Sequence, residues 1–173
     1  MMTDRNKGII YMIVSSLFFA LMATFVKLAG DIPTMEKVFF RNVVGFIVSG
    51  YMIYRSKESF KGNNIKILVY RSCFGFLGIF LYFYAIEKLP LANAVVLNQM
   101  NPFFVLIFSY IYLGESIRKP QVIAIFVALI GVMFIVRPSI DYSFIPATSG
   151  LLAAVFAAAA YTMIRHLRLT DSP

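Results

Sequence analysis

The chain has 173 residues, 60% of them hydrophobic and 14% charged, with a mean hydropathy of +0.80. This composition lies outside the range of soluble globular domains and predicts an integral membrane protein. The net charge of +8 does not indicate nucleic-acid binding, because the basic residues lie between the apolar stretches.

Apolar stretches follow one another along the chain, bounded by charged residues, proline or glycine. A helix needs roughly 20 such residues to cross the ~30 Å hydrocarbon core. Short segments that alternate apolar and polar residues, which are typical of membrane β-barrels, are absent from the sequence. We therefore predict an all-α membrane protein with about six transmembrane helices, at 8–29, 38–54, 67–86, 91–113, 121–136 and 147–164.

The basic residues between these spans predict the orientation, because cytoplasmic loops are enriched in Lys and Arg. With the N-terminus in the cytoplasm, most of the 16 basic residues fall on the cytoplasmic side. We expect an even number of crossings, both ends in the cytoplasm, and a location in the plasma (inner) membrane. The first span is too long for a signal-peptide core and is expected to remain as an anchor.

Small residues recur at intervals of three and four along several spans, which lets helix backbones approach closely in lipid. The third span carries Gly75 and Gly78 in a stripe with Tyr82, and the sixth carries Ala154 and Ala158. We expect helix packing from the glycines and alanines, whereas the tyrosine could also contact a solute.

Arg41 lies about one turn inside the second span. Glu36 or Asp31 at the outer end, or an anionic group of a solute, could neutralise it. Basic residues nearer the span ends, such as Lys27 and Arg71, are expected to extend to the interface. No Asp or Glu lies in the middle of a predicted span, so a buried carboxylate that carries protons is not expected here.

The fourth span has three amides and a proline at its middle, Asn98, Gln99, Asn101 and Pro102. Pro102 lacks an N–H and its ring crowds the carbonyl of Asn98, so the helix should bend there. Unpaired amides are costly in hydrocarbon and must face protein, water or a solute. Two explanations have equal weight: a hydrogen-bond clamp between helices beside a structural kink, or one wall of a transport pathway.

The sequence offers little for catalysis or metal binding. A single cysteine, Cys73, and a single histidine, His166, cannot form a disulfide within the chain or a metal site. The sequence has no glycine-rich phosphate loop, no Ser/His/Asp set and no HExxH motif. We expect no enzyme active site and no cofactor.

The end of the first span resembles the end of the sixth when the chain is shifted by 138 residues. The matched pairs are Phe18 and Phe156, Ala20 and Ala158, Thr24 and Thr162, Val26 and Ile164, and Lys27 and Arg165. A repeat after five spans would be inverted in the membrane, because five is odd. We predict a five-helix repeat at 1–138, followed at 139–173 by a linker and the first helix of an inverted, incomplete second repeat.

Short motifs stand in a fixed order over nearly the whole chain. They are Ala23-Thr-Phe-Val-Lys27-Leu-Ala, Glu36 with Phe40-Arg41-Asn42, Tyr84-Ala85-Ile86 followed by Leu89-Pro90-Leu91-Ala92 and Ala94, then Pro102, and Leu113-Gly114-Glu115 with Gly131 and Pro138. This ordered series resembles the EamA-type transporters of the drug/metabolite transporter superfamily.

The resemblance implies ten helices in two inverted five-helix repeats around a central cavity, and export or exchange of small metabolites or amphipathic compounds. Glu115 resembles the family's acidic residue after the fourth helix, which implies a structural role, such as pairing with Arg118. The chain would then be truncated and would need the missing second-half helices or a homodimer partner. The small multidrug pumps of the superfamily use a carboxylate in the first helix, where this chain has Ser15, Ser16 and Thr24, so antiport of cationic drugs is not implied.

We expect a secondary transporter in the lipid bilayer that exports a small organic metabolite or amphipathic solute by alternating access. The alternative is a membrane scaffold or assembly subunit whose amides only clamp helices together. The predicted substrate contacts are Ser16, Tyr82, Asn98, Gln99 and Asn101. Structural or gating roles are predicted for Lys27, Glu36, Arg41, Gly75, Gly78, Pro102 and Glu115.

Overall fold

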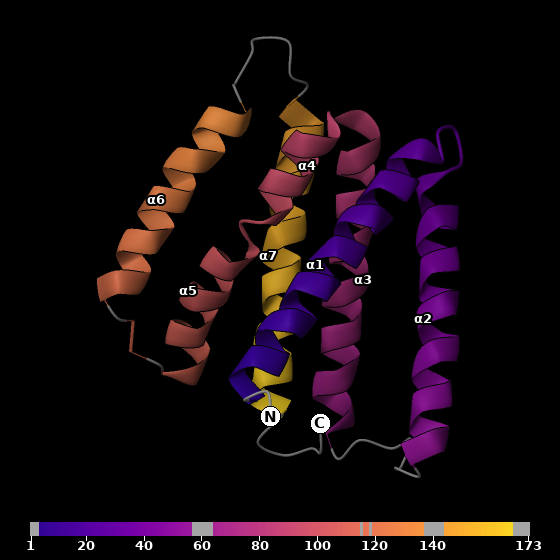
Figure 1. Cartoon of the computed structure of the whole chain (residues 1–173), viewed down its shortest axis with the longest axis horizontal. Helices are drawn as coiled ribbons and strands as arrows, with labels where there is room; N and C mark the ends of the chain where they lie inside the picture. Colours follow the sequence, from indigo (N-terminus) through magenta and orange to yellow (C-terminus); the bar gives the residue numbers. More distant parts are fainter. Residues whose placement is uncertain (1–3, 57–63, 115, 118, 137–143, 168–173) are drawn as a thin grey trace.

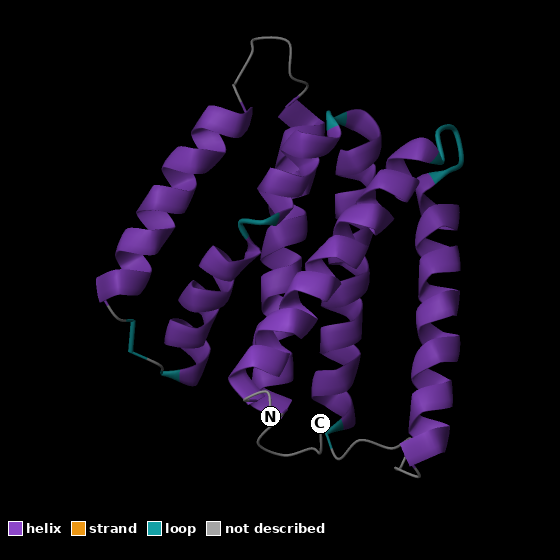
Figure 2. Ribbon diagram, in the orientation of Figure 1, coloured by secondary structure: helices purple, strands orange, loops and turns teal. Residues whose placement is uncertain are grey.

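The computed structural model describes residues 4–56, 64–114, 116–117, 119–136 and 144–167. This part of the chain contains helices joined by short connections and no strand, which confirms the predicted all-α class (Figure 2). The helices are α1 (Asp4–Leu28), α2 (Thr34–Ser56), α3 (Ile65–Lys88), α4 (Leu91–Asn98), α5 (Asn101–Leu113), α6 (Lys119–Val136) and α7 (Phe144–Leu167).

Each predicted span coincides with a helix or, for the fourth, with a pair of helices. The helices run a few residues past the apolar spans, because backbone hydrogen bonding continues into the polar flanks. Four stretches of the described chain are long and apolar enough to cross a membrane: Asn6–Leu28, Ile65–Lys88, Leu91–Leu113 and Phe144–Leu167. The α2 helix also has 23 residues but is more polar, and the apolar part of α6, Lys119–Gly131, is shorter.

The fourth span is interrupted at Gln99 and Met100, which separate α4 from α5. Pro102 lies in the first turn of α5, where its missing N–H has no partner to lose and its fixed φ suits the start of a helix. The predicted bend is therefore present as a full break. Figure 1 shows α4 and α5 offset from one another at this point.

The α7 helix lies among α3, α4 and α5 in the middle of the bundle (Figure 1). Its contact with α3 is very close, because Gly78 has no side chain to hold the helices apart. A Cβ added at Gly78 would lie 3.2 Å from the Ala157 nitrogen and 3.3 Å from the Ala153 oxygen. Ala154 and Ala158 are also fully buried. Of the glycines predicted to pack in the third span, Gly78 thus lies directly against the backbone of α7.

One end of the bundle carries the loop between α1 and α2 and the turn between α3 and α4 (Figure 1). Here the Lys27 ammonium donates to the carbonyl oxygens of Ile86, Glu87 and Leu89 at 2.8, 3.1 and 2.8 Å. Carbonyls at a helix C-terminus lack partners within the helix and attract a cation. Lys27 therefore turns back onto the end of α3, and its expected extension to the interface is wrong.

The start of α2 is attached to the same end of the bundle. The Lys37 ammonium donates to the Gly30 carbonyl oxygen at 2.9 Å, and Gly30 has the left-handed φ of 54° that favours glycine after a helix. The Thr34 hydroxyl donates to Glu87 Oε2 at 2.6 Å. Together with those of Lys27, these hydrogen bonds hold the ends of α1, α2 and α3 to one another.

Large apolar side chains are exposed on the outward faces of the helices. Phe46 on α2, Tyr112 on α5 and Phe134 on α6 are 80%, 77% and 77% exposed. Soluble monomers rarely present such extended apolar surface to water. The outward faces of the bundle are therefore suited to contact with lipid.

Candidate functional site: a polar cavity between the helices

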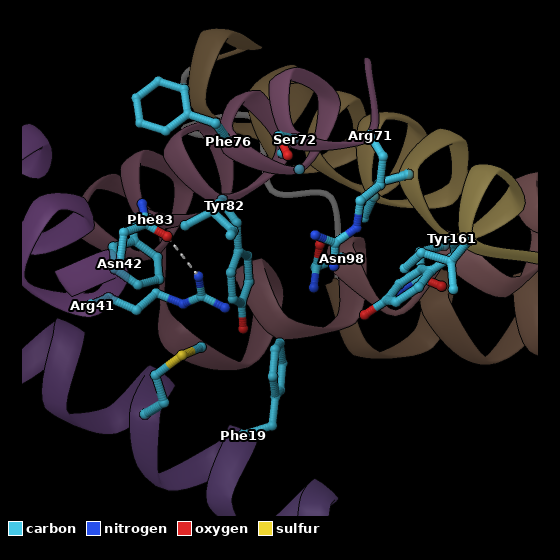
Figure 3. A pocket seen from close by; sticks show the side chains of 18 of the residues that line it. Phe19, Arg41, Asn42, Arg71, Ser72, Phe76, Tyr82, Phe83, Asn98 and Tyr161 are labelled. Atoms are coloured by element: carbon cyan, nitrogen blue, oxygen red, sulfur yellow. Dashed lines mark hydrogen bonds between the residues drawn. The ribbon is translucent and has the colours of Figure 1, made fainter. Parts of the chain in front are cut away.

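A cavity of about 690 Å³ lies between α1, α2, α3, α7 and the junction of α4 with α5 (Figure 3). Its volume falls in the range of roughly 300–1,000 Å³ that is typical of sites for small organic molecules. The wall is mixed, with phenylalanine and alanine side chains beside arginine, amide and hydroxyl groups. A solute with both polar and apolar parts would find partners in it.

The structure brings the five predicted substrate contacts together on the wall of this cavity. They are Ser16 on α1, Tyr82 on α3, Asn98 at the end of α4, Gln99 in the break and Asn101 at the start of α5. Asn98 and Asn101 are three residues apart and would share one face of a continuous helix, whereas Gln99 lies in the break between α4 and α5. Their role in substrate binding stays a prediction.

The amides at the break do not act as a clamp between helices in the described part of the chain. The Asn98 side chain is 7% exposed, yet neither it nor Gln99 or Asn101 makes a hydrogen bond with another described residue. Asn98 lines the cavity, so its amide is accessible from there and is not a fully buried unpaired group. This arrangement favours the second explanation, in which the amides await a partner inside the cavity.

Tyr82 presents a second unpaired polar group. Its ring stacks on Phe19, with 5.6 Å between the ring centroids and 10° between the planes, and the residue is only 3% exposed. Its hydroxyl is the one buried side-chain N or O atom without a hydrogen-bond partner among the described residues. By contrast, the Ser16 hydroxyl donates to the Met12 carbonyl oxygen at 2.9 Å, which leaves its oxygen to accept.

Tyr82→Phe is expected to leave the stability of the folded protein unchanged or to raise it by about 1 kcal/mol. The change removes an unsatisfied buried hydroxyl and keeps the ring that stacks on Phe19. Thermal unfolding of the purified protein in detergent measures this. A clear loss of stability would mean that the hydroxyl serves the fold and is not available to a solute.

The predicted substrate contacts left out several polar cavity residues, among them Arg41, Asn42, Arg71 and Tyr161. The Arg41 guanidinium donates to Asn42 Oδ1 at 3.3 Å. Arg71, which was expected to extend to the interface, instead lines the cavity. The sequence did contain indications for two of these residues. Arg71 lies one turn before Gly75, and Tyr161 lies three residues after Ala158, on the small-residue stripe of the sixth span.

The acidic partners considered for Arg41 do not pair with it. Glu36 and Asp31 are exposed, and neither forms an ion pair with Arg41 in the described residues. Glu36 also lies away from the cavity wall. The charge on Arg41 is therefore not neutralised by the described protein.

The two predicted packing glycines of α3 have different surroundings. Gly78 packs against α7, whereas a Cβ added at Gly75 would meet no described atom within 4 Å. Gly75 faces the cavity, so its predicted close packing is wrong for the described chain. Glu115, with the partner expected for it, Arg118, lies outside the described residues.

Comparison with known proteins assigns the chain. Residues 6–137 match the EamA-like transporter family. The chain belongs to this family. The resemblance indicated by the ordered motifs is thereby confirmed, and the family match together with the apolar helices supports an integral multi-pass membrane protein.

Named relatives include several transporters. The pseudopaline exporter CntI of Pseudomonas aeruginosa is 36% identical over 164 residues, which cover 94% of this chain and 58% of the exporter. An uncharacterized transporter of Helicobacter pylori is 30% identical over 93% of this chain and 56% of its own length. Human solute carrier family 35 member G1 is 32% identical over 83% of this chain and 40% of its own length.

The chain spans about half the length of the curated relatives it matches. No solved structure matches it.

Proposed function

We propose that this chain forms part of the solute pathway of a secondary transporter that exports a small organic solute by alternating access. The observation that carries the proposal is the convergence of unpaired polar groups on one cavity of about 690 Å³. Tyr82 and Asn98 are both buried, and neither has a hydrogen-bond partner in the described chain. Buried polar groups without partners are rare in proteins and are typical of sites that bind something.

The break between α4 and α5 supports the same proposal. Interrupted helices near the middle of the membrane are typical of transporter binding sites, because their free backbone and polar side chains face a cavity rather than lipid. The direction of transport is proposed from the relative named as a pseudopaline exporter. The scaffold alternative requires that the amides join helices, and within the described residues none of the three does so.

The proposed organisation is a five-helix repeat at 1–138 followed by the first helix of a second repeat at 139–173. The family match ends at residue 137, next to the proposed boundary. We propose that the second-half helices of the transporter, or a second copy, close the cavity opposite α1 and α3. The proposed location is the plasma (inner) membrane, with the N-terminus in the cytoplasm.

Asn98→Ala in the full-length gene product is expected to lower solute transport at least tenfold and to leave abundance in the membrane within twofold. The amide has no described partner to lose on folding, so its removal acts on the solute. Transport is measured in proteoliposomes and abundance by immunoblot of the same membranes.

The matched control is Asn93→Ala, on the same helix. Asn93 is also buried, but it is outside the cavity wall and does have a partner, so abundance should fall here. Equal losses of transport and abundance in Asn98→Ala would refute its binding role.

A further inference from the structure

The cavity wall carries positive charge without negative charge. Arg41 and Arg71 line it, and no aspartate or glutamate is among the described lining residues. Arg41 lies about two turns into α2 and Arg71 nearly two turns into α3. Figure 1 shows these helices running in opposite directions, so the two arginines belong to opposite halves of the bundle.

Neither guanidinium has a counter-ion in the described chain. Arg41 donates to the neutral Asn42 amide, and no ion pair involves Arg71 among the described residues. Ionised side chains within a membrane protein are costly unless paired. Arg41 and Arg71 are both exposed and both line the cavity, so their charges are accessible to a negatively charged partner that enters it.

Neutral donors accompany the arginines. Figure 3 shows Arg41 on one side of the Tyr82 ring and Asn98 on the other, with the Arg71 side chain extended toward Asn98. The Asn98 amide is more than nine-tenths buried and lines the cavity without a described partner. Hydroxyl, amide and guanidinium groups can all donate to the oxygens of one acidic group.

The chemistry of these groups distinguishes between classes of solute. Guanidinium forks match the planar oxygens of carboxylates and the oxygens of phosphates, and such charge-assisted bonds are stronger than neutral ones. A cationic solute would be repelled by both arginines, and a neutral solute would leave their charges uncompensated in a confined space. The stacked rings of Phe19 and Tyr82 offer an apolar surface beside the charges.

We propose that this cavity selects an organic anion, whose carboxylate or phosphate group is attracted by the charges of Arg41 and Arg71 and receives hydrogen bonds from Tyr82 and Asn98. This inference deepens the proposed transport function and rests on it. The apolar part of the anion would lie against Phe19 and Tyr82.

The test uses the full-length gene product in detergent and four probes that carry a phenyl group: 3-phenylpropionate, phenyl phosphate, the neutral 3-phenylpropionamide and the cationic 3-phenylpropylamine. Thermal unfolding is titrated against each probe at constant ionic strength. At least one of the two anions should stabilise the protein in a saturable way at concentrations tenfold below those of the amide, and the amine should not stabilise it.

Arg41→Gln and Arg71→Gln should each raise the apparent Kd for that anion at least tenfold, with partial recovery in Arg41→Lys. Arg55→Gln is the matched control, because Arg55 is an exposed arginine of α2 outside the cavity wall, and it should leave the Kd unchanged. The glutamine variants are compared at equal amounts of folded protein, as judged by size-exclusion chromatography.

Several results would overturn the proposal: no stabilisation by either anion, equal stabilisation by the amide, or glutamine variants that keep the anion preference. An arginine-dependent effect of phosphatidylglycerol, with none from the free anions, would overturn it in favour of a lipid headgroup. Proteoliposome transport separates this failure from that of the proposed function. If transport occurs but does not depend on the charge of the solute, anion selection alone is refuted. If the anion binds in an arginine-dependent way but no solute is transported, the transporter proposal alone is refuted.

Discussion

Replacing Gly78 by leucine is expected to destabilise the protein by about 3 kcal/mol and to remove most of it from the membrane. The Cβ alone would lie 3.2 Å from the Ala157 nitrogen and 3.3 Å from the Ala153 oxygen. Overpacking costs typically about 1–3 kcal/mol, and the upper end applies because backbone atoms cannot rotate away. Thermal unfolding in detergent should show a midpoint lower by on the order of 10 °C.

Gly75→Leu provides the matched comparison one turn earlier on α3. A Cβ added there meets no described atom within 4 Å, and leucine favours the helix over glycine by roughly 0.8 kcal/mol. Stability should therefore be unchanged or slightly higher. Because the new side chain enters the cavity, solute transport should nevertheless fall at least tenfold by the proposed function, in the same proteoliposome assay.

The contrast between the two glycines decides whether the seam of α3 and α7 is as close as described. Similar losses of stability in both variants would show that α3 is intolerant of bulk along its whole length. Full stability in Gly78→Leu would show that α7 does not approach α3 at this position. Either result would contradict the described packing.

The sequence was sufficient to predict the helical class and five of the residues that line the cavity. The hydrocarbon core imposes a minimum length on an apolar helix, so the spans could be read directly. The amides at 98, 99 and 101 had to face something polar, since lipid offers no partner. Pro102 predicted the bend because a proline inside a continuous helix lacks the N–H that would bond to the carbonyl four residues earlier, here that of Asn98.

The sequence alone could not predict which helices pack against one another, or through which residues. Helical spacing puts Gly75 and Gly78 on one stripe, yet only Gly78 meets α7 and Gly75 faces open space. Arg71 near a span end fits an interfacial arginine as well as a cavity arginine, because its long side chain can reach either place. Which of these occurs depends on the packing of α7 against α3, and spacing within one helix carries no information about its neighbour.

Lys27→Met is expected to destabilise the protein by about 3 kcal/mol. The substitution keeps a long unbranched side chain but removes three hydrogen bonds to the carbonyl oxygens of Ile86, Glu87 and Leu89. Hydrogen bonds from a charged donor contribute roughly 1.5–3 kcal/mol each and are not additive when they share that donor. Thermal unfolding in detergent measures the loss.

A local measurement shows where the loss of stability arises. Without the ammonium, the last turn of α3 should fray, because its carbonyls lose both their partner and the cation at the negative end of the helix dipole. Amide hydrogen exchange should become at least tenfold faster over residues 85–94. In the unsubstituted protein the Leu89 N–H donates to the Ala85 oxygen at 2.8 Å within this segment. Exchange at the seam around Gly78 should change less.

Lys88→Met is the control, since Lys88 belongs to the same turn but, among the described residues, pairs with Glu87 alone, at 3.1 Å, and its side chain is 49% exposed. Exposed ion pairs contribute at most about 1 kcal/mol, so this variant should unfold within a few degrees of the parent. Equal effects of the two substitutions would mean that any positive charge near the turn stabilises the end of α3. A large effect of Lys27→Met alone would establish that the end of α3 depends on one ammonium group that reaches across from α1.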